Sequence, residues 1–157
     1  MSADIVSPAV RSRMMSGIRG KNTKPELEIR SALHRAGFRF RLYQKDLPGR
    51  PDLVFPRYHA VLLVHGCFWH GHDCHMFRWP MTRQEFWRQK IEGNIARDWK
   101  QRTALLAMGW RIARVWECAV KGKTRLHIEN ITDQCTIWLK SNTKELEVRG
   151  YEAGATI

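Results

Sequence analysis

Most of the residues that could do chemistry in this 157-residue chain lie in one short stretch, from residue 64 to residue 75. The stretch reads Val-His-Gly-Cys-Phe-Trp-His-Gly-His-Asp-Cys-His, and it holds four of the seven histidines and two of the four cysteines. Imidazole and thiolate are the preferred ligands of zinc in proteins. Cys67, His72 and Cys74 are close enough along the chain to bind one ion, so the stretch predicts a zinc site.

A tetrahedral zinc site needs a fourth ligand, and Cys118 and Cys135 are the two candidates. Cys135 falls on an apolar helical stripe with Ile131 and Trp138, where a cysteine is usually a small buried hydrophobic residue. Cys118 follows the end of a predicted strand and has no such role, so we expect it to be the fourth ligand. Four protein ligands leave no open position, which indicates a structural rather than a catalytic metal.

His65 and His70 are two of the histidines in the stretch that the zinc site does not use. An imidazole titrates near neutral pH and is suited to take a proton from water. Asp52 begins a predicted strand shortly before them, and a carboxylate there can bind a hard cation such as Mg²⁺. A turn or capping role explains Asp52 equally well when it is taken alone. The three residues together favour a catalytic site.

The chain is strongly basic, with a net charge of +12 and a pI of about 10.1. Residues 1–50 carry eleven Lys and Arg against four Asp and Glu. Such a balance predicts a polyanionic partner, with nucleic acid as the first candidate, although a generally basic solvated surface is the alternative. Seven tryptophans are many for this length, and some of them could stack on bases. No Cys-x-x-Cys motif occurs, which argues against a thiol redox protein.

Length and composition predict one folded domain over residues 1–157, with 43% hydrophobic and 27% charged residues. No uninterrupted apolar run is long enough for a membrane span, and the N-terminus has no signal-peptide pattern, so we expect a cytoplasmic protein. The mixed spacing of His and Cys favours metal binding over disulfides.

The hydrophobic periodicity predicts an alternation of helices and strands. Residues 1–22 are expected to form a mobile arm, and residues 141–157 a loosely structured tail. Capping boxes at residues 23–26 and 82–85 predict two helix starts, the first helix ending near residue 36 and the second before residue 109. Strands are expected at residues 38–42, 52–55, 60–64 and 110–116, and a last helix at residues 125–140. This order predicts an α/β fold with a mixed central sheet flanked by helices.

Four motifs in a fixed order carry a resemblance to a known family. They are Leu-Pro-Gly-Arg-Pro-Asp at 47–52, the His/Cys run at 65–74, Glu-Phe-Trp at 85–87 and Val-Trp-Glu-Cys at 115–118. In this combination the chain resembles the very-short-patch (Vsr) mismatch repair endonucleases, from about residue 11 to residue 118. The resemblance implies a restriction-endonuclease-like core, which the predicted order of elements fits.

The resemblance also implies roles for individual residues. The catalytic set is Asp52, His70, His65 and Glu26, where His70 activates the attacking water. Glu26 also has a full structural explanation in its capping box. The implied zinc ligands are the same four as above: Cys67, His72, Cys74 and Cys118.

The implied catalytic Mg²⁺ is bound by Asp52 and by a backbone carbonyl, that of Val64. Familiar members have threonine at the position of Val64, so any hydroxyl role is lost here, while the carbonyl remains. The strand that ends at His65 lacks the acidic residue and the lysine of many restriction-type nucleases. The mismatch endonucleases lack the same pair.

The resemblance assigns a further set of residues to DNA. Phe68, Trp69 and Trp87 intercalate beside the mismatch in the family, where an aromatic wedge unstacks a base step. Core packing is the alternative for these aromatics. Met15 enters from the other groove, and Lys90 and Asn94, one turn apart on the same predicted helix, reach the DNA near the mismatch.

The expected function is therefore an Mg²⁺-dependent nick in one DNA strand at a T:G mismatch that arises when 5-methylcytosine deaminates. The products would be a 5′-phosphate and a 3′-hydroxyl. The expected partners are mismatched duplex DNA, a cognate cytosine methyltransferase and mismatch-repair proteins, with the protein itself a monomer. The alternative is a zinc-stabilised DNA-binding module without catalysis, which the missing acid and lysine and Val64 favour.

Overall fold

The structure, a computed structural model, describes residues 22–151 of the chain. Met15 and the predicted arm up to residue 21, together with residues 152–157, lie outside the described residues. Within the described part, no helix is long and apolar enough to span a membrane.

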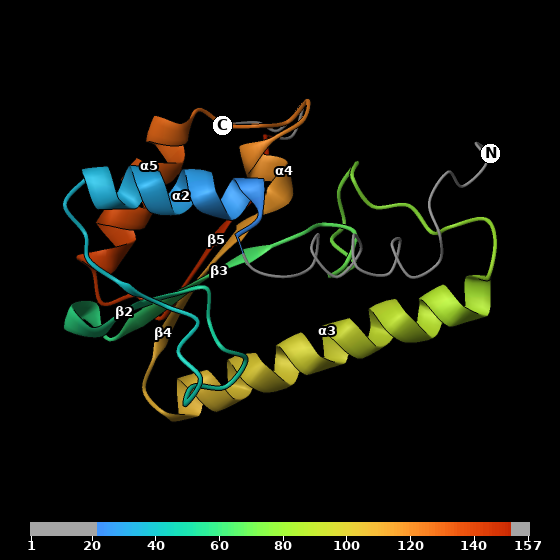
Figure 1. The fold of residues 1–157 in the computed structure, drawn as a ribbon, viewed down its shortest axis with the longest axis horizontal. Helices are drawn as coiled ribbons and strands as arrows, with labels where there is room; N and C mark the ends of the chain where they lie inside the picture. Colours follow the sequence, from blue (N-terminus) through green and yellow to red (C-terminus); the bar gives the residue numbers. More distant parts are fainter. Residues whose placement is uncertain (1–21, 152–157) are drawn as a thin grey trace.

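One five-stranded mixed sheet forms the centre of the fold (Figure 1). Its strands are β1 (Arg41–Leu42), β2 (Leu53–Phe55), β3 (Ala60–His65), β4 (Arg111–Trp116) and β5 (Glu145–Val148), and they lie in this order across the sheet. The pairs β1–β2 and β2–β3 are antiparallel, whereas β3–β4 and β4–β5 are parallel. Parallel neighbours need crossover connections, and helices provide both of them.

Helices cover both faces of the sheet (Figure 1). Helices α2 (Lys24–Arg35) and α5 (Ile128–Leu139) lie together on one face, and the long helix α3 (Gln84–Ala107) lies on the other. A short helix, α4 (Glu117–Val120), follows β4, and a 3₁₀ turn, η1 (Pro56–Tyr58), connects β2 to β3. The predicted α/β fold with a mixed sheet and flanking helices is confirmed.

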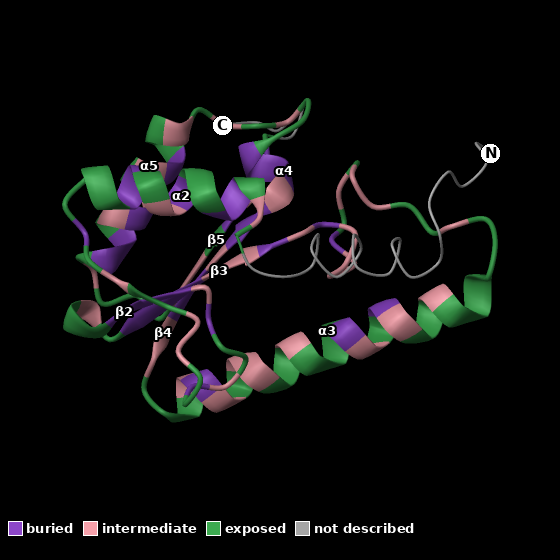
Figure 2. Cartoon of the chain, in the orientation of Figure 1, coloured by how far each residue is buried: buried purple, intermediate pink, exposed green. Residues whose placement is uncertain are grey.

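Burial is concentrated in the sheet and in the faces of α2 and α5 that pack on it (Figure 2). Helix α3 is different, because only Ile91, Asn94 and Leu105 are buried along its 24 residues. The sequence predicts a stripe of Ile91, Ile95 and Trp99 on one face, but Ile95 is 45% and Trp99 65% exposed. The helix therefore packs over only a narrow strip.

The ends of α2 explain one success and one error of the sequence analysis. The Thr23 side chain accepts a hydrogen bond from the Glu26 N–H at 3.4 Å, as the capping box predicts. At the other end, Gly37 has a φ of +102° and the Phe38 N–H donates to the Leu33 carbonyl at 3.1 Å. This helix-ending motif holds Phe38 back against α2, so the predicted strand at residues 38–42 is reduced to Arg41–Leu42.

Two further predictions are wrong. The expected capping box at residues 82–85 does not form, because Arg83 occupies the cap position with a φ of +51° and no side-chain cap. The expected loose tail instead contains β5, which pairs with β4 from Ile112–Glu145 to Val115–Val148. Val148 is buried in the core, so this segment gains apolar burial as well as backbone hydrogen bonds.

Arg111 fixes the amino end of β4 by donating hydrogen bonds to backbone carbonyls of three segments. Its guanidinium donates to Leu139 at 2.8 Å, Trp138 at 3.0 Å, Thr143 at 3.1 Å and Tyr58 at 3.2 Å. Two of these carbonyls belong to the last turn of α5, where the regular i to i+4 hydrogen bonds of the helix end. A cation at this helix end also interacts favourably with the helix dipole.

Candidate active site and metal centre

The parallel register of β3 and β4 determines where the site forms. His65 is the last residue of β3, and it pairs with Trp116, the last residue of β4. Cys67 and Cys118 each follow two residues after these partners, so the two cysteines leave the same edge of the sheet together. The carboxyl ends of parallel strands are the usual location of sites in α/β proteins.

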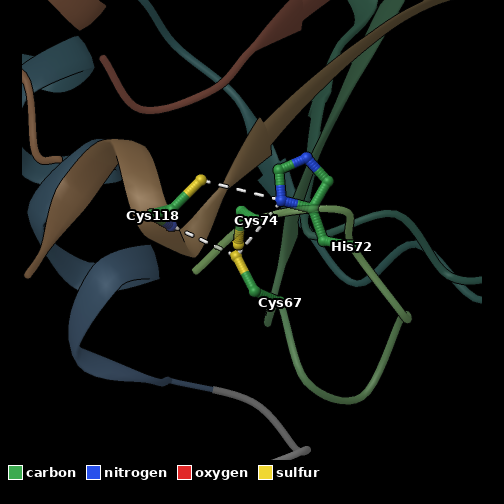
Figure 3. A group of neighbouring side chains, drawn as sticks. All are labelled: Cys67, His72, Cys74 and Cys118. Carbon is green, nitrogen blue, oxygen red and sulfur yellow. Dashed lines mark hydrogen bonds between the residues drawn. The ribbon is translucent and has the colours of Figure 1, made fainter. Parts of the chain in front are cut away.

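The structure brings the four predicted zinc ligands into one cluster (Figure 3). The ligand atoms of Cys67, His72, Cys74 and Cys118 all lie within 4.8 Å of one another. His72 Nδ1 lies 3.5 Å from Cys67 Sγ and 3.7 Å from Cys118 Sγ. Ligands at about 2.0–2.3 Å from a tetrahedral zinc ion are separated by about 3.5–3.8 Å, so these distances fit such an ion.

The electrostatics of the cluster also fit a bound cation. Burial raises the pKa of the Cys67 and Cys118 thiols, so without positive charge both would stay protonated. Backbone N–H groups point at the sulfurs: Cys118 N–H donates to Cys67 Sγ and Gly150 N–H to Cys118 Sγ, both at 3.3 Å. Such hydrogen bonds stabilise thiolates that bind a metal.

Cys135 lies apart from this cluster, as the sequence analysis predicts. It is buried on α5 among the residues that pack on the sheet, including Ile131 and Trp138. Burial raises the pKa of its thiol to about 12, so Cys135 is an inert hydrophobic residue.

A pocket of about 960 Å³ opens beside the metal cluster. Of the predicted catalytic and magnesium-binding residues, it is lined by Glu26, Asp52, Val64, His65 and His70. Phe68, Trp69 and Asn94 of the predicted DNA-binding set also line it. The cavity is therefore lined by α2, by Asp52 just before β2, by β3, by α3 and by the loop of residues 66–75, which we call the metal loop.

Asp52 lies half-buried in this pocket at the start of β2. One carboxylate oxygen accepts a hydrogen bond from the Val64 N–H at 2.7 Å, which joins the two predicted magnesium-binding residues. Burial, with a smaller contribution from the negative charge of Glu26, raises the pKa of Asp52 to about 7. A cation would favour the ionised form, so this carboxylate fits a Mg²⁺ ligand.

Glu26 is 2% exposed and is held by two neighbours. Its Oε2 accepts from the Tyr43 hydroxyl and, at 3.2 Å, from Arg30 Nη1. Burial and the contact with Glu26 raise the pKa of Tyr43 to about 12, so the phenol remains a donor. The structure thus places Glu26 in the pocket wall as a fixed acidic neighbour of Asp52.

His70 has a carboxylate partner that the sequence analysis does not predict. Its Nδ1 lies 2.5 Å from Oδ2 of Asp98, on α3. When Nδ1–H donates to Asp98, the lone pair resides on Nε2, the tautomer that a general base requires. The rings of His70 and His65 stack with centroids 3.8 Å apart, and burial lowers the pKa of His65 well below its ordinary value. His65 is therefore a neutral imidazole.

The ligand atoms of His65, His70 and Asp98 also lie within 4.8 Å of one another. The two imidazole planes are parallel to within 1°, so their in-plane lone pairs cannot converge on one ion. This arrangement favours proton transfer over metal binding.

The predicted DNA-binding aromatics form a half-buried cluster beside the pocket. Phe68 lies edge-on to Trp69 at 5.2 Å and to Trp87 at 5.4 Å between ring centroids. Trp69 and Trp87 are 5.9 Å apart. The metal loop and α3 therefore present one aromatic surface, and its contact with DNA stays a prediction.

Lys90 and Asn94 follow Trp87 along α3 at successive turns, but their environments differ. Lys90 is half-buried. Asn94 is buried, with Nδ2 donating to the Trp69 carbonyl at 2.8 Å and Oδ1 accepting from Arg97 at 2.9 Å. In this structure Asn94 fastens the metal loop to α3, and its contact with DNA stays a prediction.

Asp98 and Glu117 are the site residues that sequence reasoning missed. Glu117 Oε1 accepts the Cys67 N–H at 3.0 Å, and Oε2 pairs with Lys121 at 2.8 Å, so it anchors the start of the metal loop. Glu117 stands in a motif already recognised. For Asp98, the available signal is its spacing from Ile91 and Asn94, which places a carboxylate on the packed face of α3.

Three features indicate the class of protein: the carboxylate of Asp52 beside the strand ends, the His70–Asp98 pair in the same pocket, and the separate Cys₃His cluster. They combine a candidate hydrolytic centre with a Cys/His cluster that could bind a metal ion, both at one edge of an α/β sheet.

Comparison with known proteins gives the family. A sequence model described as DNA mismatch endonuclease Vsr matches residues 3–76. The chain is 50% identical over 132 residues to the type II nicking enzyme V.XorIIP of Xanthomonas oryzae pv. oryzae, covering 83% of this chain and 97% of that protein. It is 42% identical over 137 residues to the DNA mismatch endonuclease Vsr of Escherichia coli, with 87% and 88% covered. The chain therefore belongs to the Vsr family of DNA mismatch endonucleases.

The metal centre predicts different fates for two cysteines. Cys118→Ser should lose zinc and unfold more readily, because the metal-binding free energy of a closed site contributes to folding. Cys135→Ala should keep one zinc per chain and cost at most about 3 kcal/mol, as for a small core truncation. Atomic absorption and chemical denaturation measure both. Loss of zinc from the Cys135 variant, with retention in the Cys118 variant, would reverse the assignment.

The raised pKa of Asp52 predicts a pH-dependent cost in Mg²⁺-free buffer. The folded protein keeps this proton up to about pH 7, whereas an unfolded chain releases it near the ordinary value of 3.8. Raising the pH through this window therefore favours the unfolded chain. Asp52→Asn lacks this penalty, so its melting temperature should rise relative to wild type between pH 5 and pH 7 and level off above. We expect the melting temperature of Asp52→Asn to gain at least about 3 °C on wild type across this pH range. A difference in melting temperature that does not depend on pH would contradict the raised pKa of Asp52.

Proposed function

We propose that this protein nicks one strand of duplex DNA at T:G mismatches produced by deamination of 5-methylcytosine. The observation that carries the proposal is the His70–Asp98 pair at 2.5 Å, in the pocket that also holds Asp52. The net charge of +12 supports a DNA substrate. Family membership supports the reaction, since relatives are named as a mismatch endonuclease and as nicking enzymes.

In the proposed mechanism His70 is the general base. Asp98 accepts the Nδ1–H of His70, which orients the ring and leaves Nε2 to take a proton from the attacking water. The neutral His65 can donate one ring N–H to a phosphate oxygen. Asp52 and the Val64 carbonyl would hold a Mg²⁺ ion, which would stabilise the negative charge that develops during cleavage of the phosphodiester. The products would be a 5′-phosphate and a 3′-hydroxyl.

The other parts of the molecule have supporting roles in this proposal. Zinc on Cys67, His72, Cys74 and Cys118 is structural and fixes the loop that carries His70. The sheet with α2 and α3 corresponds to a restriction-endonuclease-like core. The aromatic surface of Phe68, Trp69 and Trp87 would open the mismatched step, which costs less than opening a paired one.

The proposed partners follow from the same function. A cytosine methyltransferase creates the base whose deamination gives the mismatch, and relatives that are named type II nicking enzymes support such a pairing. Mismatch-repair proteins are further proposed partners, and the protein is proposed to act as a monomer. Cleavage of a T:G duplex library with randomised flanks would define the sequence context.

Single-turnover nicking with saturating enzyme tests the catalytic assignment. Asp52→Ala and His70→Ala should bind mismatched DNA and nick it at least about a hundred-fold more slowly. Asp98→Asn should also be slow, because the amide favours the wrong tautomer of His70. Glu26→Gln should lose less, and Val64→Thr should be near neutral.

His127→Ala removes an exposed histidine outside the pocket and serves as the control. Wild-type nicking by His70→Ala would move the base elsewhere, with His65 the next candidate. A wild-type protein that binds mismatched DNA but does not nick it with Mg²⁺ would identify the DNA-binding module instead.

The aromatic surface predicts a loss of discrimination rather than of affinity. Trp69→Ala should leave binding to matched duplex, and its salt dependence, nearly unchanged, while reducing the preference for T:G by about tenfold. Trp99→Ala, an exposed tryptophan outside the cluster, should change neither. Competition binding measures the affinity for matched duplex and the preference for T:G over matched duplex. Equal losses on matched and mismatched duplexes would show that Trp69 is a packing residue.

A further inference from the structure

The residues that follow β5 return across the metal cluster. Arg149 donates from Nη2 to the Asp73 carbonyl and pairs through Nη1 with the Asp73 carboxylate, both at 3.0 Å. Asp73 lies between the ligands His72 and Cys74, so this double contact grips the metal loop at its turn. The contact joins residues 76 positions apart in the sequence.

Gly150 packs against Cys118, the proposed zinc ligand that follows β4. Its N–H donates to Cys118 Sγ at 3.3 Å. A Cβ atom at this position would lie 2.4 Å from Thr124 Oγ1 and 2.5 Å from the Cys118 carbonyl oxygen. Neither approach is tolerated, and the second is to backbone, so only glycine lets the chain come this close to the sulfur.

The next residue completes the attachment. The Tyr151 N–H donates to the Thr124 carbonyl at 2.8 Å, and Thr124 Oγ1 donates to the Cys118 carbonyl at 3.0 Å. We call residues 149–151 the strap. The strap contacts the Cys118 sulfur directly, and it reaches the Cys118 carbonyl through Thr124. It also contacts the turn of the metal loop at Asp73.

The metal loop transmits this grip to the catalytic pocket. The His72 N–H donates to the Cys67 carbonyl at 2.9 Å, and the His70 N–H to the Gly66 carbonyl at 3.2 Å. Gly71 lies against α3, where a Cβ would come within 2.8 Å of Ile95 and 3.0 Å of Ile91. Because the loop is tied both to itself and to α3, we expect strain at its metal end to reach His70 and its contact with Asp98.

We propose that Arg149 and Gly150 are positioning residues that lock the zinc site and, through it, the catalytic histidine. The Gly150 N–H stabilises the Cys118 thiolate, and Arg149 restrains the turn between two ligands. This inference rests on the proposed zinc site. It assigns a role in the active site to a segment that lies beyond residues 3–76, the part of the chain that the family model matches.

The test compares two glycine-to-alanine variants of the full-length zinc protein. Gly150→Ala should release zinc to a chelating indicator at least about tenfold faster than wild type, the usual scale for losing a hydrogen bond to a metal ligand. Its cobalt-substituted form should show a shifted sulfur-to-cobalt absorption band, because one thiolate loses a donor. Nicking should fall in kcat with little change in KM. Gly93→Ala, where a Cβ meets nothing within 4 Å, should match wild type in every measurement.

Arg149→Gln provides an independent arm if Gly150→Ala does not fold. It should also release zinc faster, and Arg149→Lys, which can restore one contact to Asp73, should recover part of the wild-type rate. The proposed role of the strap is wrong if wild type holds one zinc and Arg149→Gln releases zinc at the wild-type rate with an unchanged cobalt band. The same result is then required of Gly150→Ala, where that variant folds. A wild-type protein that holds no zinc would instead overturn the metal site itself, together with the strap.

Discussion

The parallel pairing of β3 with β4 is the constraint on which the rest of this molecule depends. Because His65 lies opposite Trp116, the segments that leave the two strands begin side by side at one edge of the sheet. The first segment makes the loop with three metal ligands and His70, and the second supplies Cys118 two residues later. A shift of one residue in this register would separate Cys118 from its partners and turn alternate side chains to the wrong face.

The clustering of Cys67, His72, Cys74 and Cys118 could be predicted from sequence because few residue types bind zinc and their spacing is restrictive. The choice of Cys118 over Cys135 also followed from local pattern, since an apolar helical stripe explains Cys135 completely. The His70–Asp98 pair could not be found in this way. Asp98 comes 28 positions after His70, and only the packing of α3 across the strand ends brings the two together.

The fold was predictable where local pattern and tertiary packing agree, as in α2, β3 and β4. The presence and approximate ends of α3 were also predicted, but its buried face was not, because the site occupies much of the strip that this helix covers. The strip contains polar Asn94 and Asp98, while the apolar Ile95 and Trp99 are largely exposed, so hydrophobic periodicity selects the wrong face. β5 has only four residues and two of them are glutamates, which leaves too weak a pattern to separate it from a loop.

β4 is fastened at its two ends by different kinds of chemistry. At its start, the Arg111 guanidinium holds carbonyls from η1, α5 and the connection to β5, and none of these contacts involves the metal loop. At its end, the strand runs into the cysteine cluster. Removal of the proposed metal ion would therefore release one end of the sheet and leave the other end closed, which is the condition for partial rather than global opening. In hydrogen exchange, the amides of a metal-free chain would still exchange slowly near Arg111 and Ile112 but would exchange faster toward Trp116. Loss of the ion would therefore appear as a gradient of exchange rates along β4.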